Sequence, residues 1–137
     1  MGRIVGIDPG SKRVGVAVSD SARTLALPRS SVPAGEGCVD HLIALVREIN
    51  ADVVVVGRPV SLAGAETAST VMADQLREEL RNALGDVLVV AADERLSTVS
   101  ATKSFQSAGV RAREQRERID SAAAAVLLQG YLDALAP

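Results

Sequence analysis

The stretch "RIVGIDPGSKRVGVAVSD", residues 3 to 20, decides the fold. Residues 3–8 and 12–19 are runs rich in Val and Ile, and the turn sequence "PGSK" separates them, so we expect an antiparallel hairpin. The first run ends in Asp8. A charge at the end of an apolar strand costs several kcal/mol unless it has a partner. Asp8 therefore either caps the turn or holds a ligand.

The rest of the chain alternates between strand and helix patterns. A third extended segment covers residues 24–32, and the fully apolar "ADVVVVG" that begins at Ala51 is typical of a central parallel strand. Apolar residues at helical spacing predict helices elsewhere. The expected order is completed by helices over 38–50, 67–84, about 97–108 and about 118–135, and by a fifth strand over 86–94. We predict an α/β fold with a five-stranded mixed sheet, its first three strands antiparallel, flanked by helices.

Length and composition limit the class of protein. At 137 residues with 47% hydrophobic content, we expect a single domain over 1–137. No apolar run approaches the roughly 20 residues that span a bilayer. The N-terminus lacks the layout of a secretory signal, so we expect a cytoplasmic protein. The single cysteine, Cys38, excludes an intramolecular disulfide and a cysteine-based zinc cluster, and we interpret it as an ordinary small residue at a helix start.

The charge is small overall but unevenly distributed. A net charge of −2 is not typical of a protein that coats nucleic acid non-specifically. The segment 111–118, "RAREQRER", nevertheless holds four arginines, and Lys12 and Arg13 follow closely after Asp8. The basic segment is either a solvated loop or a contact for phosphates. With one Phe, one Tyr and no Trp, stacking of bases on aromatic side chains is excluded as the main binding mode. Nucleic acid would have to be held by its backbone.

Acidic residues stand where three separate elements begin or end. Asp8 ends the first strand, Asp93 and Glu94 end the fifth, and Asp120 opens the last helix. Alternation along a strand sends Asp93 and Glu94 to opposite faces, so only one of them meets Asp8 easily. Asp120 shares a helical face with small and apolar positions, which favours an inward orientation over a role confined to the helix dipole. That face continues through Ala123, Ala124, Leu127 and Tyr131.

Three carboxylates on separate elements are what a divalent metal site requires. Mg²⁺ prefers oxygen ligands, and two such ions about 4 Å apart activate water and stabilise the leaving oxygen in phosphodiester cleavage. The single histidine, His41, lies in the first predicted helix and is expected at or near the surface. We therefore propose neither a histidine-based triad nor a zinc site.

Four blocks of this chain resemble, in order and spacing, the motifs of the YqgF family, also called RuvX. These blocks are "GIDPGSKRVGVAVSD", "VVVVGRPVSLAGAE", "ADERLSTVSA" and "RIDSAAAAVLLQGYLD". Members of the family look like Holliday junction resolvases and are described as nucleases of pre-16S rRNA. The resemblance covers almost the whole chain and implies an RNase H-like fold.

The resemblance also implies a set of functional residues. It carries over three metal ligands for Mg²⁺ or Mn²⁺, namely Asp8, Glu94 and Asp120, and it is the reason for preferring Glu94 to Asp93. By the same resemblance Arg95 pairs with an acid or a phosphate, and Lys12 and Arg13 meet the nucleic-acid backbone. Arg111 and Arg113 of the basic segment are further candidates for that contact. One departure from the family pattern is "STVS" at 97–100, where Ser97 can still cap a helix but the reciprocal acid is absent.

Several functions compete at this point. The leading hypothesis is a metal-dependent endonuclease for structured RNA, with the 5′ end of the small-subunit rRNA precursor as substrate and ribosomal particles as possible partners. A DNA junction resolvase, which would need to be a homodimer rather than a monomer, uses the same chemistry. A non-catalytic ribosome-assembly factor is a third hypothesis. An ATPase of the actin-like type is disfavoured, because 137 residues cannot supply its second domain and "DPGSK" lacks the order of a P-loop.

Overall fold

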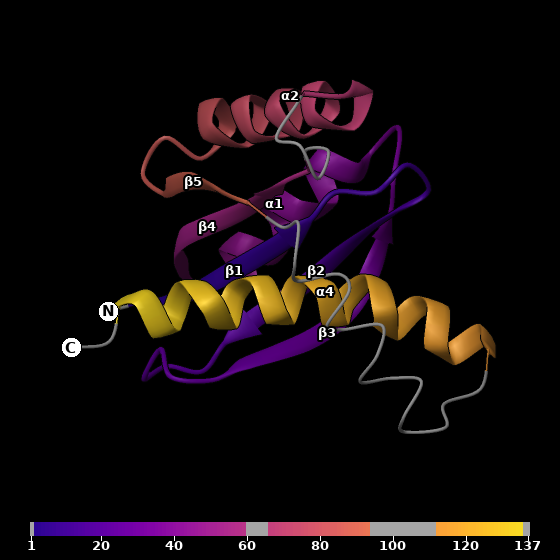
Figure 1. Cartoon of the computed structure of the whole chain (residues 1–137). Coiled ribbons are helices and arrows are strands. Elements are labelled where there is room, and N and C mark those ends of the chain that lie inside the picture. Colours follow the sequence, from indigo (N-terminus) through magenta and orange to yellow (C-terminus); the bar gives the residue numbers. More distant parts are fainter. Residues whose placement is uncertain (1, 60–65, 94–111, 136–137) are drawn as a thin grey trace.

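The computed structural model describes residues 2–59, 66–93 and 112–135, and for residues 112–120 the backbone alone. A five-stranded sheet in the order β3-β2-β1-β4-β5 forms its centre (Figure 1). The described elements along the chain are β1 (Arg3–Asp8), β2 (Arg13–Ser19), β3 (Ala26–Pro33), α1 (Cys38–Glu48), β4 (Ala51–Arg58), α2 (Ala68–Ala83), β5 (Leu88–Asp93) and α4 (Ala112–Leu135).

The predicted hairpin is present. β1 pairs with β2, and β2 pairs with β3, in both cases antiparallel. Gly10 belongs to the turn between the first two strands, where a Cβ atom would lie 2.4 Å from the carbonyl oxygen of Arg13. The turn therefore closes only because position 10 has no side chain.

The other half of the sheet is parallel. β4 pairs with β1 and β5 pairs with β4, so the apolar "VVVV" run lies in an internal parallel strand, as predicted. α1 connects β3 to β4, and α2 connects β4 to β5. The Thr67 side chain caps α2 by accepting a hydrogen bond from the backbone N–H of Thr70, whose hydroxyl accepts in return from the Thr67 N–H.

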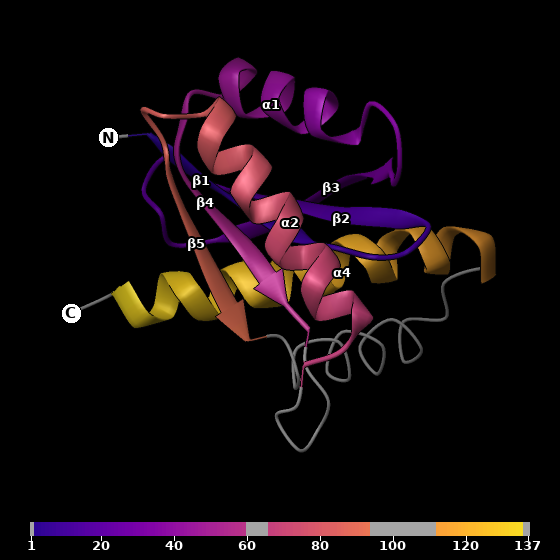
Figure 2. The same cartoon turned by 90° about the horizontal axis from the view of Figure 1, so that it is seen from above.

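Two hydrophobic cores lie on opposite faces of the sheet. On one face, Val5, Ile7, Val54 and Val56 pack with residues of α1 and α2; we call this the α1/α2 face. On the other face, Ile4, Ala17 and Val55 pack with α4; we call this the α4 face. Figures 1 and 2 show α4 crossing the sheet on the side opposite α1 and α2. Alternation along each strand thus assigns every residue to one of two faces.

The start of α4 differs from the sequence prediction. The helix begins at Ala112 and not near Arg118, so most of the basic segment is helical rather than a loop. Its residues Ala, Arg, Glu and Gln are good helix formers, but they form no apolar stripe, and the periodicity analysis therefore missed them. The correction moves Asp120 from the opening of a helix to its third turn. A favourable interaction with the helix N-terminus no longer explains that residue, because this effect is confined to the first turn.

The predicted helix over 97–108, with its cap at Ser97, lies outside the described residues. No helix in the described ranges is long and apolar enough to cross a membrane, as expected from the sequence.

Candidate active site

The candidate site lies at the edge of the sheet where the parallel strands end. β1, β4 and β5 run in the same direction, so their last residues, Asp8, Arg58 and Asp93, meet at this edge. Asp8 is half-buried, whereas Asp93 is exposed. The sequence predicted an acid at both positions, and the parallel register brings them to one side of the molecule.

Asp8 belongs to the α4 face. Ile4 packs in the α4 core, whereas Val5 and Ile7 pack in the core on the opposite face. By alternation, Gly6 and Asp8 therefore lie on the same face as Ile4. A Cβ atom on Gly6 would lie 2.8 Å from the Cβ of Leu128 and 3.1 Å from the carbonyl oxygen of Ala124. The helix thus packs against the backbone of β1 at Gly6, two residues before Asp8 on the same face of the sheet.

α4 runs opposite to β1, as both views show (Figures 1 and 2). Moving along β1 from Gly6 to Asp8 therefore corresponds to moving along α4 from Ala124 toward position 120, one turn earlier. Ala123, Ala124 and Leu127 are buried, so the face predicted for Asp120 is the face that packs on the sheet. The backbone brings position 120 toward the end of β1. Glu94 lies outside the described residues.

Asp93 belongs to the other face of the sheet. Val90 and Ala92 pack against the α4 core, so alternation puts Asp93 on the α1/α2 face, away from Asp8. Its register partner on β4 is Arg58, which binds residues of α2. The sequence did not decide which of the adjacent acids Asp93 and Glu94 faces Asp8. In the structure, Asp93 lies on the side of the sheet opposite Asp8.

Arg58 ties the end of β4 to α2. Its Nε donates to Asp74 Oδ1 at 3.0 Å, and a terminal nitrogen donates to Glu66 Oε1 at 2.6 Å. Arg77 also bonds to Asp74 at 3.0 Å. The Arg58 guanidinium holds the pKa of Asp74 below its usual value. Sequence reasoning did not single out Arg58, which directly follows the apolar run of the block "VVVVGRPVSLAGAE".

The predicted phosphate contacts are only partly described. Lys12 lies in the turn after β1 and Arg13 begins β2; both are exposed. Arg13 lines a cavity of about 240 Å³ together with Ser30, Ser31 and Pro33. Arg113 lies in the first turn of α4, where the structure gives the backbone alone. Arg95 and Arg111 lie outside the described residues.

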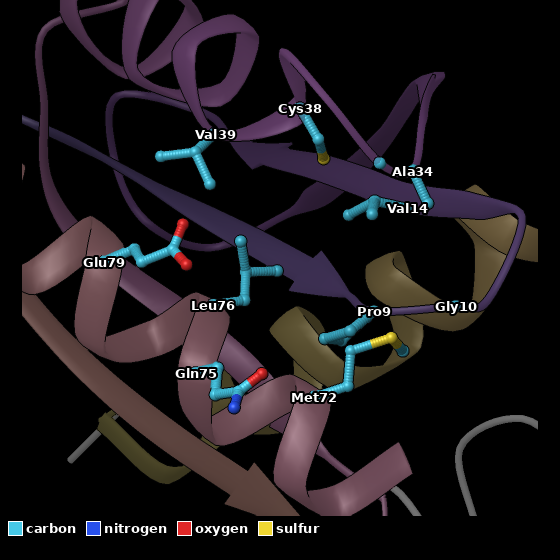
Figure 3. Close-up of a pocket in the computed structure, with 11 residues that line it drawn as sticks. Pro9, Gly10, Val14, Ala34, Cys38, Val39, Met72, Gln75, Leu76 and Glu79 are labelled. Atoms are coloured by element: carbon cyan, nitrogen blue, oxygen red, sulfur yellow. The ribbon is translucent and has the colours of Figure 1, made fainter. Parts of the chain in front are cut away.

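A second cavity, of about 150 Å³, lies on the α1/α2 face (Figure 3). Its lining is mostly apolar and includes the turn residues Pro9 and Gly10, with Gln75 and Glu79 as polar neighbours. Cys38 contributes a buried thiol whose pKa is raised, first by burial and then by Glu79, so the thiol is protonated and unreactive at neutral pH. This confirms the interpretation of Cys38 as a packing residue. One carboxylate beside an inert thiol gives this cavity no hydrolytic chemistry.

The described side chains do not by themselves form a complete metal site. Within the described part of the chain, no three His, Cys, Asp or Glu side chains gather closely enough to hold a metal ion. His41 is exposed on α1, as expected. Of the three predicted ligands, Asp8 is the one whose side chain the structure describes.

The sheet order, the helix packed across it and the acid at the end of the central strand are those of a protein with an RNase H-like fold. Two solved structures share this fold. The Thermus thermophilus RuvC in complex with a Holliday junction substrate has a TM-score of 0.58 at 16% identity and covers 98% of this chain and 96% of its own. The Fowlpox virus Holliday junction resolvase has a TM-score of 0.61 at 12% identity, with 98% and 99% covered.

Sequence comparison identifies the family. The model of RuvX, described as Holliday junction resolvase, matches residues 2–134, and the chain belongs to this family. A protein of Nocardia farcinica is 45% identical over 140 residues, covering 96% of this chain and 78% of the relative. One of Mycolicibacterium paratuberculosis is 46% identical over 134 residues, covering 96% and 80%. Both carry the name "Putative pre-16S rRNA nuclease". The resemblance found in the four motif blocks and the expected fold class are confirmed.

Proposed function

We propose that this protein is a metal-dependent endonuclease that trims structured RNA, with the 5′ end of the 16S rRNA precursor as its substrate. The observation that carries the proposal is the position of Asp8, at the end of the central strand and on the face covered by α4. The names of the relatives support the substrate. We assign the activity to one domain over residues 1–137, acting in the cytoplasm on RNA or on ribosomal particles.

The residues fit a hard divalent cation. We propose that Asp8, Glu94 and Asp120 hold Mg²⁺ or Mn²⁺, because all three supply carboxylate oxygens and the described site has neither a histidine nor a thiolate. The Asp93 position on the opposite face favours Glu94 as the ligand from β5. When bound, two such ions would activate a water and stabilise the leaving oxygen of the phosphodiester.

The remaining residues bind and orient the substrate. Lys12 and Arg13 follow Asp8 around the hairpin turn, which suits them to the phosphates next to the cleaved bond. Arg113 in α4, together with Arg95 and Arg111, extends the basic surface along the backbone. We assign all of these cations to phosphates, and we therefore expect recognition of RNA structure rather than of sequence.

Cleavage assays with Asp8→Asn test this function. In Mn²⁺, the wild-type protein should cut a precursor rRNA fragment, and the variant should be at least about 100-fold slower because a carboxylate that holds the metal ion is lost. Asp40→Asn is the matched control, since Asp40 is an exposed aspartate of α1 on the far face. Equal rates for wild type and Asp8→Asn would contradict the assignment.

A DNA junction resolvase is the second candidate, favoured by the family description and by the two solved structures. The same assay on a four-way DNA junction decides between them. A resolvase must cut two strands symmetrically, so junction cleavage should come with a homodimer in solution. If neither substrate is cut while the rRNA fragment is bound, a non-catalytic assembly factor becomes the better description.

A further inference from the structure

The register between β2 and β3 contains a bulge in the same row as Asp8. Val14 pairs with Val32 and Val16 pairs with Arg29, so one residue of β2 stands opposite two of β3. That residue is Gly15, and the two opposite it are Ser30 and Ser31. On its other side Gly15 pairs with Asp8. The row therefore runs from Asp8 across a residue without a side chain to a pair of serines.

Opposite Gly15 on β3 stand the two serines. Asp8 and Gly15 lie on the α4 face, because Val14 and Val16 on either side of Gly15 pack in the α1/α2 core. Arg13, two residues before Gly15, shares that face, and it lines the 240 Å³ cavity with both serines. Neighbouring strands lie about 4.8 Å apart, so the bulge is roughly 10 Å from Asp8 across the sheet.

The side chains of this cavity have the chemistry of a phosphate site. Each serine offers a hydroxyl donor, and the guanidinium of Arg13 has five N–H donors in a fork that fits two phosphate oxygens. Arg13 also has a partner within the protein, and a guanidinium with five N–H donors can bind more than one acceptor. Serine hydroxyls and arginine are among the groups with which proteins bind nucleic-acid backbones.

Protection of the sheet edge is the other explanation of the bulge. β3 is an edge strand, and bulges blunt such edges, but they also occur beside active sites, where they redirect side chains. A bulge protects a sheet edge through its irregular backbone, so edge protection alone would not require serine hydroxyls at this position. Pro28 and Pro33 already remove two N–H donors from this strand. The row shared with Asp8 and the cavity shared with Arg13 favour a binding role.

We infer that Arg13, Ser30 and Ser31 form a subsite for a backbone phosphate of the nucleic-acid substrate, roughly 10 Å across the sheet from Asp8, where we propose that the phosphodiester is cleaved. The inference rests on the proposed nuclease function. The subsite fixes where the strand lies relative to the site of cleavage, so it positions the substrate and takes no part in the chemistry.

A methylphosphonate series on the precursor rRNA fragment tests the subsite. Each RNA carries one neutral linkage, and its dissociation constant is measured by fluorescence anisotropy in Ca²⁺ without Mn²⁺, so that binding is read separately from cleavage. For the wild-type protein, one linkage near the cleaved bond should weaken binding about tenfold, as expected for losing a hydrogen bond to a charged group. For the double variant S30A/S31A, the unmodified RNA should bind about tenfold more weakly, and the same linkage should have a smaller further effect, because only the contact with Arg13 is then left to lose.

Two further double variants control for folding and for the loss of any serine. S30T/S31T keeps both hydroxyls and should keep the wild-type profile. S21A/S69A removes two exposed serines elsewhere, in the β2–β3 turn and in α2, and should do the same. The inference fails if S30A/S31A, with a wild-type melting temperature, shows the full wild-type effect of the sensitive linkage, or if S30T/S31T loses that effect.

The results also separate this inference from the proposed function. If Asp8→Asn abolishes cleavage while S30A/S31A has the wild-type profile, the nuclease assignment stands and the subsite is wrong. If the wild-type protein binds neither the rRNA fragment nor a four-way DNA junction, both are wrong.

Discussion

Arg58 and Asp74 form the best-defined ion pair near the candidate site, and they give the protein a specific response to acid. Hydrogen bonding to Arg58 is the main cause of the lowered pKa of Asp74. A carboxyl group whose pKa is lower in the folded state stabilises the fold above its unfolded pKa of about 3.9, and this contribution is lost as the pH falls through the folded value.

We therefore predict that Asp74→Asn loses stability relative to wild type at pH 6 but much less at pH 3. The urea midpoint at the two pH values measures this. Asp133→Asn, which changes an exposed aspartate of α4, serves as the comparison and should leave the acid response of the wild type unchanged. The same difference between Asp74→Asn and wild type at pH 6 and at pH 3 would rule the explanation out.

At the scale of elements, the docking of α4 on β1 determines how close position 120 comes to Asp8. The packing is tight at Gly6, where an added Cβ would meet Leu128 and Ala124. Gly6→Ala must push the helix away or strain the strand. We predict that it lowers the free energy of unfolding by about 1 to 3 kcal/mol, as overpacking does, and that it reduces cleavage beyond what lost stability explains.

Gly130→Ala is the matched substitution for this test, because Gly130 lies in the same helix and an added Cβ would meet nothing within 4 Å. Alanine is the better helix former, so this variant should gain about 0.5 to 1 kcal/mol and keep its activity. Chemical denaturation and cleavage rates, measured at a temperature where all variants are folded, provide both readouts. Unchanged stability in Gly6→Ala would show that the helix position is not fixed by this packing.

The elements also show what the sequence could predict and what it could not. Period-two runs and turn residues predicted the hairpin, and the apolar run at 53–56 predicted a central strand; both are confirmed. The predicted start of α4, near Arg118, was wrong because the first part of this helix is polar and has no hydrophobic periodicity to detect. Alternation predicted that Asp93 and Glu94 face opposite sides, but only the packing of Ala92 identifies the side of Asp93. The bulge at Ser30 and Ser31 depends on register, which local sequence does not encode.

At the scale of the whole molecule, the net charge of −2 means that the protein does not attract a polyanion by its total charge. Binding must depend on where the arginines lie. On the α1/α2 side, Arg47 is engaged by Asp86 at 2.9 Å and Arg81 lies 3.7 Å from Glu78. The basic segment 111–118, most of which forms the start of α4, instead holds four arginines against two glutamates.

Two double variants with equal charge separate position from total charge. Arg111→Gln with Arg113→Gln, and Arg47→Gln with Arg81→Gln, both change the net charge from −2 to −4. We predict that only the first pair lowers the slope of log affinity against log salt for the rRNA fragment, by roughly 0.7 to 0.9 for each phosphate that an arginine no longer neutralises. Anisotropy titrations between low and moderate salt measure the slope. Equal slopes for the two variants would indicate that the basic segment is a solvated surface and does not bind phosphates. A change confined to the first pair would indicate that the nucleic acid runs from Asp8 along the start of α4.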